Sequence, residues 1–171
     1  MKLVIASDIH GSAFWCKKLC EVVEEVKPDK LVLLGDLLYH GPRNDLPRDY
    51  APKRVIPMLE QYREKILAVR GNCEAEVDQM VLSFPCMSDF ALLECDGKTF
   101  YLTHGHKWHP EQLPPLGKGS LFLFGHTHVK LDKEVEGIRC LNPGSVSIPK
   151  DGSHSCLVYE GGEFSFRILE E

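Results

Sequence analysis

Short apolar runs alternate with helical patterns along the first half of the chain. The runs have the length and the Gly or polar boundaries of buried strands, and the segments between them repeat apolar residues at helical spacing. We predict strands at residues 2–6, 30–34 and 65–69, and helices between Ser12 and Pro28, at residues 52–62 and at residues 76–82. Pro57 either kinks the second helix or delays its start. Strand–helix–strand order is typical of parallel crossovers, so this half is interpreted as alternating α/β structure.

The pattern changes near Phe90, and the second half is predicted to be mostly β-structure. Residues 91–95 and 98–103 form a hairpin pattern around the turn dipeptide Asp96-Gly97. A strand follows at residues 120–124, and further strands are predicted near Glu134, Ile138, Ser155 and Phe164. No linker or repeat separates the halves, so we expect one domain over residues 1–171. Two sheets packed face to face, with helices outside, would bury these many apolar strands.

Composition and charge limit the classes of partner. The 171-residue chain is 43% hydrophobic, which is enough for one sizeable core. Its net charge of −5 repels nucleic acid and anionic lipid, and it has no basic patch with interleaved aromatic residues, so we expect no nucleic-acid-binding surface. No apolar run approaches the roughly 20 residues of a membrane helix. An anionic substrate would therefore need a local positive centre.

The cysteines favour neither a disulfide framework nor a thiolate zinc site. There are seven of them, an odd number, and no Cys-x-x-Cys pair occurs. The first residues predict a strand and no signal peptide. A reducing cytoplasm is the expected compartment.

Five strand-like runs stop on a short polar motif, and these motifs are the candidate site. Strand ends at one edge of a sheet bring neighbouring loops together, and each Gly allows a sharp turn or a close approach of the backbone. Five coincidences are far more specific than any one of them. The motifs are Asp8-x-His10, Gly35-Asp36, Gly71-Asn72, His104-Gly105-His106 and Gly125-His126-Thr127-His128.

The chemistry of these side chains points to metal ions. Carboxylate, imidazole and amide oxygen suit Mn, Fe, Co, Ni or Zn, and the absence of thiolate argues against a structural zinc site. The set is too large for one tetrahedral ion but suits two ions that share a bridging carboxylate. Two divalent ions with Asp8 and Asp36 leave a net charge of about +2, which would attract an anion. Two metals about 3.5–4 Å apart stabilise in-line displacement at phosphorus.

Each residue taken alone has an alternative interpretation. Asp36 after Gly could simply start a turn. His126 and His128 would face opposite ways on a continuing strand, so the loop after Gly125 must bend to aim both inward. Arg43, in the irregular segment that follows Asp36, is either a phosphate clamp or a solvated loop residue.

The ordered set of motifs resembles the calcineurin-like metallophosphoesterases, and more narrowly the small bacterial phosphodiesterases of YfcE type. The resemblance covers nearly the whole chain and implies a four-layer α/β/β/α sandwich of two mixed sheets. The stretches that carry it are residues 6–11 (ASDIHG), 40–44 (HGPRN), 69–73 (VRGNC), 103–106 (THGH), 125–128 (GHTH) and 142–149 (NPGSVSIP).

The resemblance also implies a dinuclear centre. A hydroxide bridging the two metals would attack the phosphorus, with Asp36 as the bridging ligand and Asn72 and His104 steadying the developing charge. Manganese is the favoured ion, with Fe, Ni, Co or Zn as alternatives. The implied ligands are Asp8, His10, Asp36 and His128 for one metal, and Asp36, Asn72, His104 and His126 for the other.

Cys73 departs from the broader family, many of whose members carry His after Gly-Asn. A neutral thiol with a pKa of about 8.5 is a poorer proton shuttle than imidazole, which favours substrates whose leaving group needs little protonation. Cys73 and Arg43 are the expected substrate contacts, and Glu74 could orient the site.

The leading functional hypothesis is a metal-dependent phosphodiesterase acting on small phosphodiesters. One alternative is a phosphomonoesterase or nucleotidase using the same metals. Another is a non-catalytic scaffold, since a eukaryotic retromer subunit has this fold with a degraded site; the complete ligand set argues against it. Relatives of this branch form oligomers, so a homo-oligomer is a further expectation.

Overall fold

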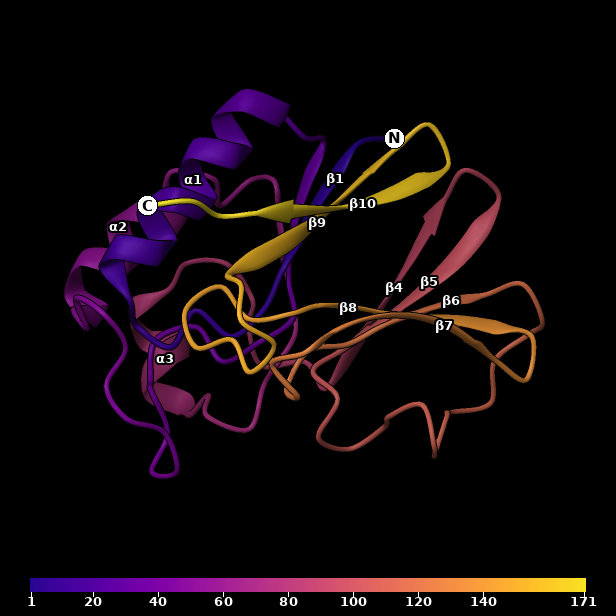
Figure 1. Cartoon of the computed structure of the whole chain (residues 1–171). Coiled ribbons are helices and arrows are strands. Elements are labelled where there is room, and N and C mark those ends of the chain that lie inside the picture. The colour runs from indigo at the N-terminus through magenta and orange to yellow at the C-terminus, as the bar shows by residue number, and fades with distance from the viewer.

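The computed structural model describes residues 1–171 and contains two five-stranded sheets with helices beside the first of them (Figure 1). The helices are α1 (Ala13–Val26), α2 (Pro52–Glu60) and α3 (Glu76–Val81). The strands are β1 (Leu3–Ala6), β2 (Lys30–Leu33), β3 (Ile66–Ala68), β4 (Phe90–Cys95), β5 (Lys98–Thr103), β6 (Leu121–Leu123), β7 (Lys130–Val135), β8 (Ile138–Pro143), β9 (Ser155–Glu160) and β10 (Glu163–Ile168).

The first sheet has the strand order β10-β9-β1-β2-β3. β1 pairs in parallel with β2, with Leu3 opposite Lys30, and β2 pairs in parallel with β3, with Leu33 opposite Ala68. The predicted crossovers are therefore confirmed, and the carboxyl ends of these three strands lie at one edge. α2 begins at Pro52 and contains Pro57, so a delayed helix start is wrong.

The second sheet has the order β4-β5-β6-β8-β7. β4 and β5 form the predicted antiparallel hairpin, with Cys95 opposite Lys98 across the Asp96-Gly97 turn. β5, β6 and β8 are mutually parallel neighbours. Their carboxyl ends also meet at one edge, which places the segments after β5 and β6 side by side.

Period-two alternation along β1 divides the core between two layers. Leu3 and Ile5 belong to the apolar cluster between the two sheets, whereas Val4 and Ala6 belong to the cluster beneath the helices. A strand buried on both faces in this way must place the polar residues that follow it at the sheet edge, because the core around it offers them no water.

The outer face of the second sheet is covered by the irregular segment of residues 104–120. Trp108, Leu113 and Leu116 from this segment pack against a cluster that includes Tyr101 and Phe122. The predicted sandwich of two mixed sheets flanked by helices is confirmed, and its fourth layer is irregular because this segment is rich in Pro and Gly. None of the helices has the length and apolar character needed to cross a membrane.

Candidate metal centre

The predicted ligands come together where the two sheets meet. Three groups of side chains place their candidate ligand atoms within 4.8 Å of one another. Asp8, His10 and Asp36 each belong to two of these groups, which joins the clusters into one centre. The groups are Asp8 with His10 and His128, Asp8 with Asp36 and His104, and His10 with Asp36 and Cys73.

One part of the centre is formed by Asp8, His10 and His128. The Nε2 atoms of His10 and His128 lie 3.3 Å apart, and each lies 3.0–3.3 Å from Asp8 Oδ1. The Nδ1 atom of His10 donates to the carbonyl of Tyr39 at 2.9 Å, and that of His128 donates to the carbonyl of Ile148 at 2.7 Å. In the neutral rings both Nε2 atoms therefore carry lone pairs that face each other, which is favourable only with a cation between them.

The other part is built on Asp36, Asn72 and His104. His104 Nε2 lies 3.3 Å from Asp36 Oδ2 and 3.0 Å from Asn72 Oδ1. Its Nδ1 donates to the carbonyl of Leu34 at 2.6 Å, so this ring also presents Nε2 to the centre. Asp36 Oδ2 lies 3.7 Å from His10 Nε2 as well, so the carboxylate contacts both parts.

These residues fit divalent ions by an independent criterion. Asp8 Oδ2 accepts hydrogen bonds from Ser7 Oγ at 2.6 Å and from the His126 backbone at 3.0 Å, but the buried Oδ1 has no donor. Two ligand atoms about 2.1 Å from one ion stand roughly 3.0–3.4 Å apart, which matches the separations around Oδ1. An orphaned carboxylate oxygen inside a ring of imidazole nitrogens is the expected geometry of a metal ligand.

His126 lies beside this centre without joining the three groups. Its ring centroid is 5.1 Å from that of His104, and its backbone N–H holds Asp8. Burial and the neighbouring His104 lower the pKa of His126 to about 4, so this ring is neutral at physiological pH and free to bind a cation.

The backbone conformation of the motifs explains how the side chains converge. Five predicted ligands have positive φ, a region that non-Gly residues seldom adopt. His126 and His128, at φ 65° and 60°, supply the bend after Gly125 that lets both rings turn toward the centre. The others are Asp8, His10 and Asp36.

The glycines of the motifs are needed for close approach. A Cβ on Gly71 would overlap Asp36 Oδ1 and lie 2.6 Å from the Asp36 backbone nitrogen. A Cβ on Gly125 would overlap Ser7 Oγ and lie 2.8 Å from Asp8 Oδ2. Each Gly therefore keeps space for a neighbouring carboxylate, which is the role the sequence pattern predicts for it.

The carboxylates of the centre are ionised, and they stabilise positive charge on neighbouring groups. Burial alone would raise the pKa of Asp8, but His10 and His128 hold it well below its ordinary value. Burial would likewise lower the pKa of His104, but Asp36 and Asp8 raise it to about 9. A protein without metal would thus carry a proton on His104, and a metal ion would displace it.

Glu74 holds two of the motif loops together. Its Oε2 accepts hydrogen bonds from the backbone of Asp36 at 2.9 Å and of Gly71 at 2.5 Å, and its Oε1 accepts one from Leu37 at 2.7 Å. The side chain is buried, with 3% exposure. The sequence suggested an orienting role for Glu74, and the contacts show that it acts through the backbone around Asp36.

The loop after β8 fixes the first motif, and sequence reasoning assigned it no role. The hydroxyls of Ser145 and Ser147 both donate to the carbonyl of Asp8, at 2.9 and 3.0 Å. The same loop supplies the Ile148 carbonyl that orients His128. Its residues were part of the family resemblance, but only the fold reveals that they hold the ligands from behind.

A polar groove of about 470 Å³ opens over the centre and has no hydrophobic lining. Arg43, the substrate contact expected from the sequence, lines it, and Lys150 provides a second cation that the sequence did not single out. Lys150 reaches the groove because its backbone N–H donates to the carbonyl of His128 at 2.9 Å. Two cations beside a metal centre can bind the oxygens of a phosphate. The remaining lining residues are Asp36, Asn44, Asn72, His126, Thr127 and His128.

Cys73 lies against the centre as a neutral thiol. Its backbone N–H donates to Asp36 Oδ1 at 2.9 Å, and its Sγ accepts a hydrogen bond from Asn72 Nδ2 at 3.3 Å. Burial and the nearby Asp36 carboxylate raise the pKa of the thiol well above its ordinary value. This environment suits neither a thiolate nucleophile nor a proton shuttle.

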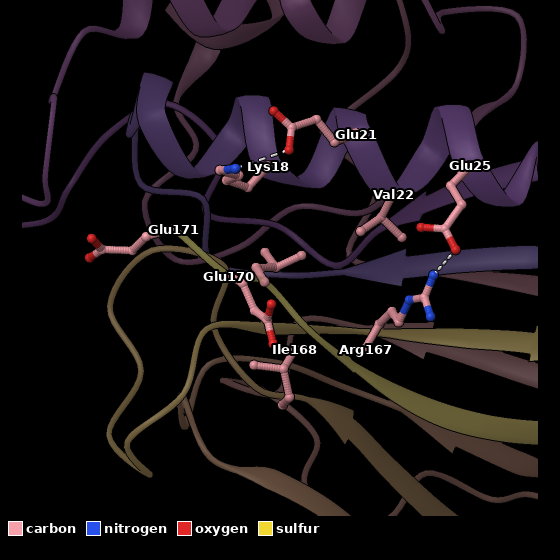
Figure 2. A pocket seen from close by; sticks show the side chains of 9 residues that line it. Lys18, Glu21, Val22, Glu25, Arg167, Ile168, Glu170 and Glu171 are labelled. Carbon is pink, nitrogen blue, oxygen red and sulfur yellow. Dashed lines mark hydrogen bonds and ion pairs between the residues drawn. The ribbon is translucent and has the colours of Figure 1, made fainter.

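The largest cavity lies away from the metal centre. It has a volume of about 640 Å³ and lies between α1 and the end of the chain. Figure 2 shows Lys18 beside Glu21 and Arg167 beside Glu25, so its basic groups are already paired with acidic neighbours. None of the predicted ligands lines it.

Several known proteins similar to this chain are named as phosphoesterases. Residues 1–161 match the model of the calcineurin-like phosphoesterase superfamily domain. Phosphodiesterase YfcE of Escherichia coli K12 is 45% identical over 153 residues, which cover 90% of this chain and 83% of that protein. The solved structure of YfcE, described as a phosphoesterase, has a TM-score of 0.92 at 38% identity and covers 99% of this chain and 100% of its own. Phosphodiesterase MJ0936 of Methanocaldococcus jannaschii is 26% identical over 84% of this chain and 83% of its own.

Proposed function

Because the chain belongs to the calcineurin-like phosphoesterase superfamily, we propose that it is a metal-dependent phosphodiesterase that hydrolyses small phosphodiesters. The resemblance noted from the sequence is confirmed. The observation that carries the proposal is the pair of Nε2 atoms of His10 and His128, which lie 3.3 Å apart beside the unpartnered Oδ1 atom of Asp8. A divalent ion bound between these three atoms would give each of them a partner. Since both sheets contribute ligands, residues 1–171 are proposed to act as one catalytic domain.

Two divalent ions are proposed to bind at this centre, with manganese favoured. The chemistry that a bound ion pair supplies is activation of water to a bridging hydroxide and neutralisation of phosphoryl oxygens. Asp36, which contacts both parts of the centre, is proposed to be the shared ligand. The proposed ligands are Asp8, His10, Asp36 and His128 for one ion, and Asp36, Asn72, His104 and His126 for the other.

The substrate phosphate is proposed to lie in the polar groove. Arg43 and Lys150 bind its non-bridging oxygens, and the amide of Asn72, which also lines the groove, steadies the charge that develops on them. His104 is buried and does not line the groove, so it is proposed to steady this charge through the ion that it would hold. The attacking oxygen forms its bond to phosphorus as the bond to the leaving oxygen breaks. The leaving oxygen departs with that electron pair and is protonated by solvent, since the raised pKa of Cys73 makes its thiol a poor donor.

The test is a chelated protein to which single divalent metals are restored. We expect hydrolysis of bis(4-nitrophenyl) phosphate to disappear on chelation, to return most fully with Mn²⁺, and to exceed hydrolysis of 4-nitrophenyl phosphate at least about tenfold. A preference for the monoester would favour a phosphomonoesterase or nucleotidase. Bound metal with no turnover of any phosphoester would favour a protein-binding scaffold.

A further inference from the structure

A second cavity adjoins the polar groove and differs from it in chemistry. Its volume is about 440 Å³, and His126 and Thr127 line both spaces, so the two are adjacent. We call it the side cavity and define it by Phe124, His126, Val129, Leu131 and Lys133. The groove has no hydrophobic lining, so any apolar group of a substrate must leave the groove to find an apolar surface.

The wall of the side cavity is set by the alternation of side chains along one strand. The face of β7 that borders the cavity carries Leu131 and Lys133, and Val129 directly precedes the strand. These residues are spaced two apart, so their side chains lie on the same face. Phe124, 3% exposed, provides the apolar floor at the end of β6. The strand thus presents two apolar side chains near the centre and one cation farther away.

The charged rim of the side cavity is internally paired. Glu111 accepts from His109 Nδ1 at 2.9 Å and lies 3.9 Å from Lys133 Nζ. These groups satisfy one another, so the features available to a ligand are the apolar floor and His106, whose buried Nδ1 atom has no hydrogen-bond partner. A cavity of this size with an apolar floor and a polar rim fits one planar aromatic group.

We propose that the side cavity binds an aromatic ester group of the substrate while the phosphate lies in the polar groove. This inference rests on the proposed function and extends it to a substrate class: phosphodiesters with at least one aromatic substituent, such as an aryl ring or a base. The other apolar cavity near the centre, lined by Tyr39, Tyr50, Cys73 and Val81 among others, shares no lining residue with the groove. The lining residues that the side cavity shares with the groove therefore favour the side cavity.

The experiment measures binding without requiring turnover. Phenylphosphonate and methylphosphonate carry the same phosphonate head but differ in the aromatic group, and their affinities for the manganese-loaded protein can be compared by calorimetry. We expect phenylphosphonate to bind about tenfold more tightly, as partial burial of a ring predicts. Val129→Trp fills the side cavity from a position that is 39% exposed and should abolish this ratio while leaving methylphosphonate affinity unchanged.

Two further variants make the outcome decisive. Val81→Trp, at a position 44% exposed in the other apolar cavity, is the matched control and should keep the ratio. Lys133→Trp fills the side cavity from β7 and replaces Val129→Trp if that variant loses metal through its neighbour His128. Three results would each overturn the inference. The first is equal affinity of the unmodified protein for phenylphosphonate and methylphosphonate. The others are an unchanged affinity ratio in the variants with a filled side cavity and a lost ratio in Val81→Trp. The proposed phosphodiesterase activity is tested by a separate measurement, because its failure would appear as an absence of diester hydrolysis.

Discussion

The two parts of the candidate metal centre differ in the burial and the anchoring of their side chains. The closed side consists of Asp8, His10 and His128, which are 0%, 1% and 4% exposed. The open side consists of Asn72, His104 and His126, of which only His104 is buried, while Asn72 is exposed and His126 is half-buried. Both imidazoles of the closed side are anchored by backbone carbonyls, whereas the anchoring bond of His126 comes from its backbone N–H.

This difference assigns separate tasks to the two sides. A closed set of anchored ligands has little freedom to lose when an ion binds, so it should hold metal more tightly. The open side borders the polar groove through Asn72 and His126, where a substrate would arrive. We therefore expect the closed side to define the centre and the open side to exchange ions and contact the phosphate.

The strongest way to break both sides at once is Asp36→Asn. Asp36 contacts His10 and His104 and lies between the two parts, and an amide of the same size lacks its negative charge. We expect kcat/KM for bis(4-nitrophenyl) phosphate with Mn²⁺ to fall by at least about 10³-fold. Thermal unfolding of the variant should still be cooperative, because the amide can accept the backbone bond from Cys73.

Near-normal activity of Asp36→Asn would refute the shared-ligand assignment. Loss of the cooperative unfolding transition would instead show that the carboxylate is needed for folding. A circular dichroism spectrum and the metal content of the same sample separate these results.

The comparison is sharpened by removing one imidazole from each side. His128→Ala should empty the closed side and leave less than about one metal per chain, with activity reduced about 10²–10³-fold. His126→Ala should retain the closed-side ion and lose about 10–10²-fold. Elemental analysis after gel filtration measures the metal content, and equal losses in the two variants would contradict the distinction.

The sequence was sufficient to predict the edge at which the ligands meet. Strands 2–6, 30–34 and 65–69 lie within about two residues of β1, β2 and β3, and their parallel order places Asp8, Asp36 and Asn72 together. The strands and their shared edge could be predicted because the buried-strand pattern and the glycine at each strand end are local features of the chain.

The sequence could not predict which ligands are closed and which are open. His126 and His128 occur in one motif, and they are distinguished by the Ile148 carbonyl, which comes from a loop 20 residues away. The sequence assigned no role to Lys150 or Ser145 for the same reason, since neither belongs to a motif of metal ligands. Contacts between distant segments depend on packing, which no local pattern encodes.

Removing the metal should make stability sensitive to alkaline pH. Although burial lowers it, contacts with Asp36 and Asp8 raise the pKa of His104 to about 9, whereas the unfolded chain has a value near 6.5. The protonated ring therefore stabilises the metal-free fold fully below about pH 6.5. This contribution, on the order of 3 kcal/mol, is lost as pH rises toward 9.

The measurement is the Tm of the chelated protein between about pH 6 and pH 10. This range spans the pKa values of His104 in the unfolded and the folded protein. His10 acts in the same direction, because Asp8 raises its pKa against the effect of burial. The manganese-loaded protein is the control and should show a much smaller fall, since the ions replace the protons as positive charge. A flat Tm in the chelated protein would mean that the carboxylates have other partners.

The smallest expected effect is that of Cys73→Ser, which tests whether the open side relies on the thiol. The raised pKa keeps Sγ protonated, and its contact with Asn72 is one that a hydroxyl of similar size can also accept. We expect kcat/KM to change less than about threefold. A loss comparable with that of His126→Ala would place Cys73 among the residues that bind metal or substrate, because the backbone bond from Cys73 to Asp36 survives the substitution and cannot account for it.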